Sequence, residues 1–512
     1  MMTRIEQDLE WDVIIVGGGA TGLGTAIDSA ARGYTTVLLE QDDFAKGTSS
    51  RSTKLVHGGV RYLKQGNVAL VLEALRERGR LKKNAPHLVS DLPFIVPVYD
   101  WWEGPFYGIG LRVYDWMSGR LGLGDSENLS REETLARLPT IESDGLRGGV
   151  VYFDAQFDDA RLALNMAQTA AGLGATVANY VRVIGMTKTN SVVRGVVCRD
   201  EETGRDIELR GKVVINATGV FSDSIRRMDD PDVRPVITPS QGVHIVLDQS
   251  FLPGNSAIMV PNTDDGRVLF AIPWHGTTVI GTTDTEVPFP SLEPKALEEE
   301  IDFLLTHAAR YLTHDPIRSD VRSVFAGLRP LVSSGEDDTS AISREHTILI
   351  STSGLVTITG GKWTTYRVMA KDAVDQAAIA GGLEPTKSST KKLKIHGWTD
   401  SPTDSYPLGV YGSDADGLNE LISADPGLVE VIHPDLPYVK AQVVWAVREE
   451  MARTVEDVLS RRTRAILLYA RASLECARSV AEIMQVELDQ SEDWVDDQVA
   501  TYSKIAAGYI LS

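Results

Sequence analysis

The sequence contains very little cysteine: only Cys198 and Cys476 occur among 512 residues. Two cysteines exclude a disulfide framework and a metal cluster held by cysteines, and they fit a reducing compartment, so we expect a cytoplasmic protein. We also predict no metal site. The one pattern that faintly resembles a calcium loop, Asp414-Ala415-Asp416-Gly417, lacks the remaining ligand spacing and is typical of a solvated turn.

Basic residues are in deficit, with 51 Lys and Arg against 71 Asp and Glu, which gives a net charge of −20. This balance argues against nucleic acid as a partner. The sequence also has no run of roughly 18 apolar residues that could form a membrane-spanning helix, and the start MMTRIEQDLEWD lacks the pattern of a secretory signal. We therefore expect a globular protein that does not cross a membrane.

The first informative motif is a glycine-rich turn near the N-terminus. Residues 12–16 are predicted to form a buried strand, and Gly17-x-Gly19-x-x-Gly22 follows directly, with a helix expected to about Gly33. Gly17 allows the sharp turn, Gly19 lets backbone N–H groups approach a pyrophosphate, and Gly22 lets the helix pack closely on the strand. This pattern predicts an adenine dinucleotide site at the start of the helix.

Three later segments fit the same cofactor. The predicted strand 35–39 ends at Glu40, 18 residues beyond Gly22, near the position of an acid that accepts a ribose hydroxyl. Strands are also predicted at 213–216, ending in Ala217, Thr218 and Gly219, and at 355–359, ending in Gly360 and Gly361. The glycine turn alone leaves NAD and FAD open, and the two later strands favour FAD because both can place backbone beside one elongated cofactor.

Further motifs occur at residues 48–63, 280–285, 326–331 and 359–367. Together with the glycine turn, they resemble the FAD-dependent glycerol-3-phosphate dehydrogenases, within the glycine/D-amino-acid-oxidase-like flavoproteins. The resemblance covers nearly the whole chain. It implies an α/β fold with a Rossmann-type FAD-binding domain, an antiparallel β cap and a C-terminal helical domain. Arg51 is an addition to the usual family pattern, and Trp363 stands where a smaller apolar residue is common.

The residues expected to contact FAD come from these motifs. Residues 48–52 offer hydroxyls and backbone donors after the ribose-binding strand, and His57 precedes bare glycine backbone that suits a flat isoalloxazine ring. The predicted cofactor-binding residues are Gly17, Gly19, Gly22, Glu40, Thr48, Ser49, Ser50, His57, Gly58, Gly59, Ala217, Thr218, Gly219, Gly360, Gly361, Lys362 and Thr364.

The substrate implied by the resemblance, glycerol 3-phosphate, carries nearly two negative charges at neutral pH. An acidic chain must hold such a group in a local cationic pocket, and arginine can donate two parallel hydrogen bonds to a phosphate. The predicted substrate-binding residues are the cations Arg61, Arg329 and Lys362 and the hydroxyl-bearing Tyr62, Thr282 and Thr283.

The implied reaction oxidises the C2 alcohol to dihydroxyacetone phosphate, with hydride transfer to the flavin and proton transfer to a base. Histidine suits the base because its usual pKa of about 6.5 lies near working pH. His57 and His244 are the two options, with His57 ranked first because His244 could equally be a core histidine in an alternating strand. Lys362 could alternatively stabilise the reduced flavin ring.

Members of this family pass electrons to membrane quinone, whereas related oxidases use oxygen and carry a long insertion that is not found here. Quinone is therefore the predicted acceptor. It requires contact with an anionic membrane surface, so we expect a peripheral protein on the cytoplasmic face of the cell membrane. The candidate contacts are the segment 101–117, rich in Trp and Tyr, and the basic run of Arg76, Arg78, Arg80, Lys82 and Lys83.

Three alternative functions remain open from the sequence: an oxidase that uses oxygen, an amine- or amino-acid-oxidising flavoprotein, and a non-enzymatic flavin-binding scaffold. The three predicted cations count against an amino-acid substrate, since a carboxylate needs fewer cations than a phosphate. The candidate bases and the cations together count against a scaffold. A homo-oligomer is also left open.

The predicted domains follow changes in composition along the chain. The FAD-binding domain is expected to be discontinuous, with residues 1–90, 155–235 and 336–383, and the cap to comprise 91–154 and 236–335. A linker rich in Pro, Ser, Thr and Lys is predicted at 384–407. Apolar spacing of three and four residues predicts a helical domain at 408–512, with Glu449, Glu450 and Asp457 on an exposed helix face.

Overall fold

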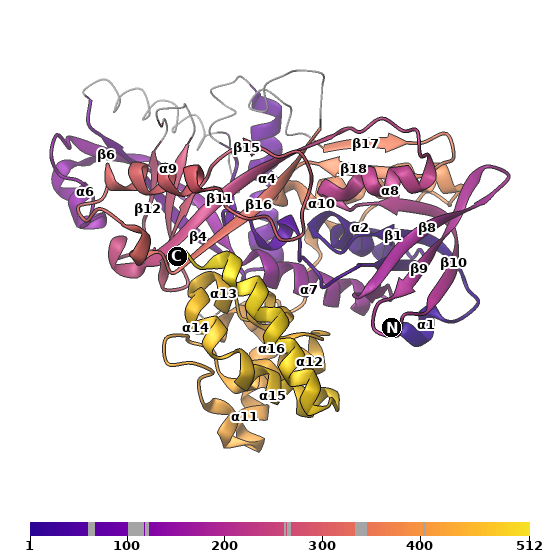
Figure 1. Cartoon of the computed structure of the whole chain (residues 1–512). Helices are drawn as coiled ribbons and strands as arrows, with labels where there is room; N and C mark the ends of the chain where they lie inside the picture. The colour runs from indigo at the N-terminus through magenta and orange to yellow at the C-terminus, as the bar shows by residue number, and fades with distance from the viewer. Residues whose placement is uncertain are drawn as a thin grey trace.

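The computed structural model describes residues 1–59, 67–100, 117, 122–260, 263, 268–332, 346–402 and 406–511. Its strands form two large sheets that stand side by side, and a group of helices lies below them (Figure 1). The α/β fold predicted from the sequence is confirmed, with its Rossmann-type sheet, antiparallel cap and helical C-terminal domain.

The first sheet is the Rossmann-type sheet, which is mostly parallel at its centre. β1 (Glu10–Val16) pairs in parallel with β2 (Thr36–Leu39) and β10 (Asp206–Asn216). Parallel pairing continues outward to β7 (Thr176–Ala178) on one side and β18 (Val356–Gly360) on the other. The antiparallel strands of this sheet are β8 (Val181–Thr189), β9 (Val192–Asp200) and β17 (His346–Ile350).

Both faces of this sheet are buried, which explains the nearly continuous apolar sequence of its central strand. Val13 and Ile15 pack toward a helical layer, whereas Ile14 and Val16 pack on the opposite face. The helical layer consists of α2 (Ala20–Ala31), α7 (Asp159–Gly172) and α10 (Tyr366–Gly381), and the opposite face carries α8 (Ser222–Asp229) with the β8–β9 hairpin. A short helix, α1 (Met2–Ile5), precedes β1.

The second sheet is the cap, and its order is β15-β11-β14-β13-β12-β4-β6-β3, with β16 paired to β11 and β5 paired to β6. All of its pairings are antiparallel except that of β12 with β4. The bounds are β3 (Leu55–Val56), β4 (Val89–Val98), β5 (Glu127–Ser130), β6 (Gly148–Phe157), β11 (Ile237–Asp248), β12 (Ala257–Val260), β13 (Leu269–Trp274), β14 (Thr277–Gly281), β15 (Thr285–Glu286) and β16 (Ser323–Val332). Its helices are α4 (Val68–Asn84), α6 (Arg131–Arg137) and α9 (Glu298–Ala309).

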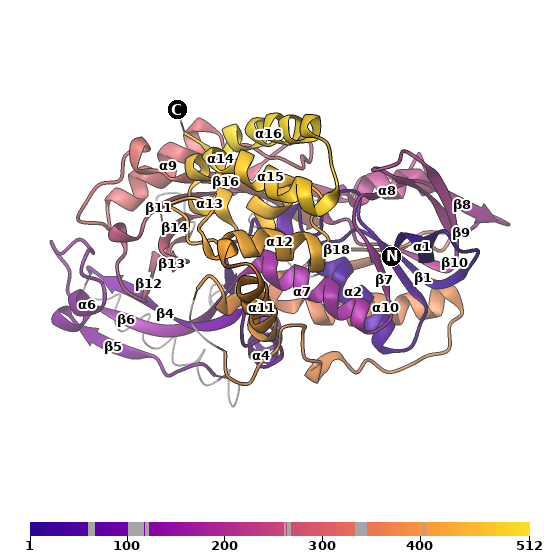
Figure 2. The ribbon, with the colours of Figure 1, turned by 90° about the horizontal axis from the view of Figure 1, so that it is seen from below.

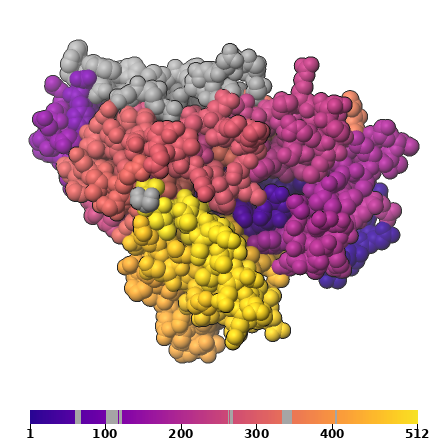
Figure 3. All heavy atoms as spheres, viewed as in Figure 1, coloured from indigo at the N-terminus to yellow at the C-terminus, as the bar shows by residue number. Residues whose placement is uncertain are grey.

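The C-terminal helices form a lobe that projects from the two sheets (Figure 3) and, seen from below, lies across their junction (Figure 2). Their core continues into the cap sheet through Val246, Trp274, Val279 and Phe325. The helices are α11 (Ala415–Ala424), α12 (Lys440–Glu449), α13 (Ala465–Leu468), α14 (Ala470–Glu475), α15 (Ala477–Leu488) and α16 (Glu492–Ala506). No helix among the described residues is long and apolar enough to span a bilayer.

Part of the predicted exposed acidic face in this lobe is wrong. Glu449 is exposed, but Glu450 and Asp457 are buried. Glu450 forms an ion pair with Arg161 on α7, and Asp457 forms one with Arg461. Burial of these carboxylates is possible because each faces a guanidinium. Arg161 lies 289 residues from Glu450, so no local pattern indicates that pair. Arg461 lies four residues after Asp457, a spacing that the sequence shows, but the spacing does not reveal that the pair is buried.

The segment predicted as a linker is docked along much of its length. The carbonyls of Glu384 and Thr386 accept hydrogen bonds from Tyr34 and Arg32, and Ile395 N donates to the carbonyl of Asn84. Ser388 and Thr390 also donate from their hydroxyls to the Asp28 carboxylate on α2, so both the backbone and the polar side chains of this stretch bond to the rest of the chain.

The basic run on α4 also differs from its prediction. Arg78 is buried and forms an ion pair with Asp154, so it cannot contact a membrane. Arg80 pairs with Glu77, and Lys82 lies 2.6 Å from Asp91. Arg76 and Lys83 are exposed. The aromatic residues 101–116 lie outside the described residues.

Candidate active site

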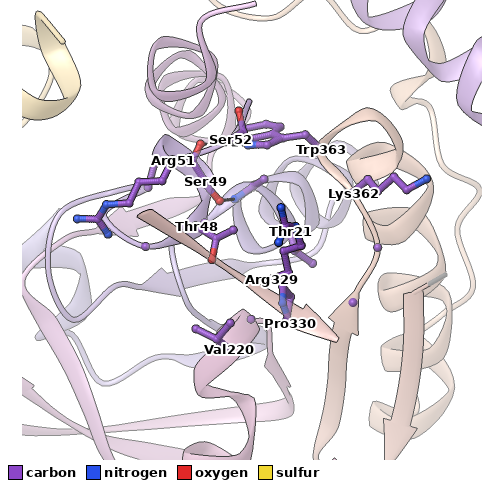
Figure 4. A pocket seen from close by; sticks show the side chains of 18 of the residues that line it. Thr21, Thr48, Ser49, Arg51, Ser52, Val220, Arg329, Pro330, Lys362 and Trp363 are labelled. Carbon is purple, nitrogen blue, oxygen red and sulfur yellow. Dashed lines mark hydrogen bonds between the residues drawn. The ribbon is translucent and has the colours of Figure 1, made fainter. Parts of the chain in front are cut away.

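A cavity of about 900 Å³ is lined by residues of both sheets. On the side of the parallel sheet, its wall is formed by the loops that follow β1, β2, β10 and β18, which is where α/β sheets bind dinucleotides. On the side of the cap, residues of β11, β13, β14 and β16 and their loops contribute. Figure 4 shows Thr48, Ser49 and Arg329 near the centre of the cavity, with Arg51 and Lys362 directed to opposite sides.

The turn between β1 and α2 has no room for side chains. Gly17 has φ +108°, and a Cβ there would lie 2.8 Å from the carbonyl oxygen of Ala217. A Cβ at Gly22 would lie 1.8 Å from the carbonyl oxygen of Gly17, which agrees with the packing role expected for this glycine. Gly17 and Gly19 line the cavity, and Gly19 is the N-cap of α2, so the start of that helix faces the cavity.

Glu40 lines the same end of the cavity and is held by backbone donors. Gly18 N donates to Oε2 at 2.5 Å, and Asp42 N donates to Oε1 at 3.0 Å. Burial raises the pKa of Glu40 to about 7, although these two N–H groups act in the opposite direction. The carboxyl group therefore titrates near neutral pH at the position expected for a ribose acceptor.

The loop after β2 brings the predicted hydroxyls to the cavity. Ser49 Oγ accepts a hydrogen bond from Ala20 N at 2.9 Å, and Thr48 Oγ1 donates to the carbonyl of Leu328 at 2.6 Å. Trp363 Nε1 donates to the carbonyl of Ser49 at 3.0 Å, so the larger side chain at this position fixes the loop. Ser50 is not among the lining residues, and its carbonyl faces away, toward Lys54 Nζ at 2.8 Å.

Arg51, which departs from the usual pattern, directs its guanidinium out of the cavity. Its Nη1 donates to the carbonyls of Lys46 and Leu292, and its Nη2 pairs with Glu293 at 2.6 Å. A further bond of 3.0 Å joins Nη2 to the hydroxyl of Tyr509. Arg51 therefore ties the loop to the cap and to the C-terminal end of the chain.

The donor set of this end fits an extended dinucleotide. Ala217, Thr218 and Gly219 line the cavity after β10, and Gly360 and Gly361, both with positive φ, line it after β18. Bare backbone, the start of α2 and the Ser49 region thus meet along one cavity that is long enough to reach the cap. His57, Gly59, Lys362 and Thr364 also line it, whereas Gly58 does not; its N–H donates to Asp154 at 3.2 Å.

The cap end of the cavity carries one of the predicted cations, Arg329, and a second, Lys362, reaches the cavity from the parallel sheet. Arg329 on β16 donates from Nη2 to Thr282 Oγ1 at 3.1 Å and to the carbonyl of Thr283 at 3.0 Å, and its Nη1 lies 3.3 Å from Asp284. Its side chain remains 24% exposed, toward the cavity that it lines. Lys362 lines the cavity from the loop after β18. Arg61 and Tyr62 lie outside the described residues.

The two candidate bases both line the cavity but differ in burial. His57 is half-buried, and its backbone N–H donates to Thr364 Oγ1 at 3.3 Å. His244 is only 2% exposed, stacks on Phe325 at 4.7 Å between ring centroids, and has Nε2 2.9 Å from Thr53 Oγ1. Burial lowers the pKa of His244 well below its usual value, and the nearby cations Lys54 and Arg329 add to this effect.

Several residues of the cavity were not predicted from the sequence. Thr53 and Asp284 lie within motifs that the sequence analysis quoted, so their neighbours could have indicated them. An aromatic wall formed by Phe94, Tyr152 and Phe270 had no local signal. The rings of Phe94 and Tyr152 stack at 5.3 Å, and Phe94 meets Phe270 edge-on at 5.9 Å. These residues come from β4, β6 and β13 and meet only in the folded sheet.

Comparison with known families divides the chain into two parts. Residues 12–367 match the model of the FAD dependent oxidoreductase family. Residues 365–495 match the C-terminal domain of alpha-glycerophosphate oxidase.

Individual relatives agree with this assignment. The chain is 41% identical to mitochondrial glycerol-3-phosphate dehydrogenase of Mus musculus, over 97% of this chain and 73% of the relative. The mitochondrial glycerol-3-phosphate dehydrogenase of Arabidopsis thaliana is 40% identical, over 93% and 82% of the two chains. A crystal structure of glycerol-3-phosphate dehydrogenase from Bacillus halodurans complexed with FAD has a TM-score of 0.81 at 28% identity and covers 100% of this chain and 98% of that one.

Proposed function

Because this chain belongs to the family of FAD-dependent glycerol-3-phosphate dehydrogenases, we propose that it oxidises glycerol 3-phosphate at C2 to dihydroxyacetone phosphate. Its cofactor is FAD, which supplies a two-electron acceptor for the substrate hydride when bound. One observation carries the proposal: a single cavity joins a dinucleotide end, marked by Gly17 and Glu40, to a cationic end that contains Arg329.

The dinucleotide end would hold FAD through backbone groups and short side chains. The start of α2 and the Ser49 region are suited to the pyrophosphate, because N–H groups and the helix dipole favour negative charge. Glu40 as a carboxylate would accept hydrogen bonds from a ribose. The glycines after β18 would allow the flavin ring to approach the backbone closely.

The substrate phosphate is assigned to Arg329. Its guanidinium is oriented by the Thr282 hydroxyl and the Thr283 carbonyl, so it is already fixed before a substrate arrives. Asp284 balances part of its charge, and a dianionic phosphate would contribute more charge than this single carboxylate. Lys362 brings a second cation to the cavity, for either the phosphate or the flavin.

His57 is proposed as the base that takes the C2 hydroxyl proton. It is the more accessible of the two histidines, whereas His244 is nearly completely buried. The depressed pKa of His244 keeps its ring neutral at working pH, and its contacts with Thr53 and Phe325 fix its orientation. His244 would then hold the substrate in a fixed position, by accepting a hydrogen bond from it or donating one to it. His244 is also the second candidate for the base.

The proposed electron acceptor is membrane quinone. The aromatic wall of Phe94, Tyr152 and Phe270 supports this assignment, because a flat apolar ring packs well on aromatic side chains and a glycerol phosphate does not require them. Oxygen is the competing acceptor, and the acceptor test below separates the two.

A membrane quinone as acceptor requires contact with the membrane, so we also propose peripheral attachment to the cytoplasmic face of the cell membrane. Arg76 and Lys83 are exposed on α4. The label of this helix lies above the C-terminal lobe in Figure 1. Replacing both with Glu should weaken binding to vesicles that contain anionic lipid, measured by co-sedimentation. Lys504→Glu on α16 is the matched control, since Lys504 is exposed on the opposite lobe. If the α4 variant, the Lys504→Glu control and the unaltered protein bind these vesicles equally, α4 is not the membrane contact.

Anaerobic reduction tests the reaction directly. The purified holoenzyme is mixed with glycerol 3-phosphate in the absence of oxygen, and flavin absorbance is followed. Rapid bleaching is expected, with glycerol, which lacks the phosphate, as the matched control. Bleached enzyme is then mixed separately with a soluble quinone and with oxygen, and faster reoxidation by the quinone is expected. Absence of bleaching in a sample with bound flavin would contradict the substrate and leave the fold unaffected.

A further inference from the structure

The loop of residues 40–54, called here the cofactor loop, has two sides with different neighbours. One side lines the cavity through Glu40, Thr48 and Ser49. The other side is held by buried charged groups, most of which belong to a short segment of the C-terminal lobe with the sequence Arg461-Arg462-Thr463-Arg464. The side chains of all three arginines are at most 2% exposed.

The first anchor lies at Asp43, three residues after Glu40. Both Arg461 and Arg462 donate hydrogen bonds to its Oδ2. Arg461 also pairs with Glu456 and Asp457, each at 2.7 Å, and Arg462 donates to the carbonyl of Glu450 at 2.5 Å. Although burial opposes it, Arg462 and Arg461 lower the pKa of Asp43, so the carboxylate stays charged between the two guanidinium groups.

The second anchor lies at Ser50, within the part of the loop that follows the cavity hydroxyls. Arg464 Nη2 donates to the carbonyl of Ser50 at 2.8 Å and to Asp159 Oδ1 at 2.8 Å. Lys54 Nζ donates to the same carbonyl at 2.8 Å and to Asp159 Oδ2 at 2.7 Å. Arg464 has φ +64°, a conformation that is unusual for a non-glycine residue, and its Nη1 donates to the carbonyl of Ser460 at 3.2 Å, so its two terminal nitrogens reach different acceptors.

Two further contacts hold the loop at Lys46, between the two anchors, and at Arg51, directly after the second anchor. Lys46 Nζ pairs with Glu456 at 3.0 Å, and Arg51 Nη2 meets the Tyr509 hydroxyl at 3.0 Å. Although burial opposes it, Arg461 and Lys46 lower the pKa of Glu456 to about 2. The C-terminal lobe thus contacts the loop at its beginning, middle and end.

The choice of charged groups at this boundary is informative. A buried ion pair adds little net stability, because the cost of removing both charges from water offsets their attraction. The pair does require its two side chains to adopt one particular geometry. An apolar contact would hold the two domains together equally well. The arginines are concentrated where the loop turns its other side to the cofactor site, so their geometry fixes the backbone that contacts the cofactor.

We propose that the C-terminal helical domain is a clamp on the cofactor loop, in which Arg461, Arg462 and Arg464 are positioning residues that hold the loop in its FAD-binding conformation and slow FAD release. This inference goes beyond the proposed reaction, because it concerns retention of the cofactor and not the substrate. Its test needs no substrate. The clamp can therefore be confirmed even if the proposed oxidation of glycerol 3-phosphate is wrong, and the clamp can be wrong even if the proposed oxidation is confirmed.

The test measures the rate of FAD release from full-length holoenzyme, followed by the rise in flavin fluorescence after dilution. Arg462→Lys and Arg464→Lys keep the charge but remove the forked geometry that reaches two acceptors at once. Each is expected to release FAD at least about tenfold faster, the order expected for loss of one charge-assisted hydrogen bond. Arg161→Lys is the matched control, because Arg161 is buried at the same domain boundary and pairs with Glu450, without a described contact to the loop.

A second measurement separates the clamp from general stability. Amide hydrogen exchange should increase within residues 41–54 in Arg462→Lys and Arg464→Lys and stay unchanged there in Arg161→Lys. If either arginine variant does not fold, Glu456→Gln weakens the Lys46 contact more mildly from the C-terminal side and should accelerate FAD release several-fold. FAD release and loop exchange equal to those of the unaltered protein, in folded variants, would overturn the proposal.

Discussion

The two ends of the cavity are built in different ways. At the end proposed to bind the dinucleotide, the wall is largely backbone without side chains, as at Gly17 in the first turn and at Gly360 and Gly361 after β18. At the end proposed to bind the substrate, the wall carries the ionisable side chains of His57, His244 and Arg329, which come from distant parts of the chain. A site built from backbone tolerates almost no substitution at its glycines. In a site built from side chains, each substitution removes the contacts of one residue only.

The largest expected effect tests the backbone end. Gly22→Ala places a Cβ against the carbonyl of Gly17, so the turn must shift. We expect purified Gly22→Ala to bind FAD at least about a hundredfold more weakly, or to lack it. FAD content and the dissociation constant are measured, with Gly172→Ala as the control, because nothing lies within 4 Å of a Cβ there. Full FAD occupancy in Gly22→Ala would show that this end of the cavity does not depend on the absence of a side chain at Gly22.

The next effect concerns the base. His57→Ala should slow anaerobic flavin reduction by about 10²-fold, the usual contribution of a general base, while FAD remains bound. His244→Ala is measured in parallel by stopped-flow absorbance. A normal rate for His57→Ala together with a slow rate for His244→Ala would move the role of base to His244.

Arg329→Ala should affect substrate binding more than the cofactor. Loss of the charge-assisted bonds to a phosphate is expected to raise KM for glycerol 3-phosphate by about ten- to a hundredfold, with unchanged FAD content. Arg318→Ala, which removes a partly exposed arginine of the cap paired with Glu298 and Asp302, is the control for surface charge. Unchanged kinetics in Arg329→Ala would remove this residue from the phosphate site.

The smallest expected effect is a pH dependence of FAD binding, and it tests the contribution of one side chain, Glu40, at the dinucleotide end. The pKa of Glu40, raised to about 7 by burial, means that the group is mostly protonated at pH 6 and mostly ionised at pH 8. Because a ribose hydroxyl donates best to the carboxylate, FAD binding should tighten several-fold as pH rises from 6 to 8. Titration of apoprotein with FAD at each pH measures this. In Glu40→Gln the dependence should be much flatter, and an equally steep dependence there would assign it to another group.

The sequence predicted the strand, glycine turn and helix at this end of the cavity in detail, because their signals are local. Gly17, Gly22 and Glu40 all lie within 24 residues, and each spacing reflects one strand, one turn and one helix. The cap strands in 236–335 and the C-terminal helices also followed from alternation and from three- and four-residue spacing. The roles proposed for Arg329, Lys362 and the two histidines depended on the family resemblance, since an isolated charged residue has no distinctive local pattern.

The failures of prediction have one physical cause, which is that burial of a charge depends on its partner. Arg78 was expected to face a membrane and Asp457 to face solvent, yet both are buried because Asp154 and Arg461 neutralise them. Asp154 lies 76 residues from Arg78, on a different element. No periodicity along the chain indicates such a pairing.

The sequence by itself determined the strand, glycine turn and helix that form the dinucleotide end, because these depend on backbone conformation and on neighbours a few residues apart. Only the tertiary structure decided that Ser240 of β11 lies opposite Arg329 of β16, that an aromatic wall faces the same cavity, and that Arg464 reaches the loop at Ser50. These contacts join residues separated by tens to hundreds of positions. Chain folding sets their distances, since the packing of whole sheets and helices, and not local propensity, brings them together.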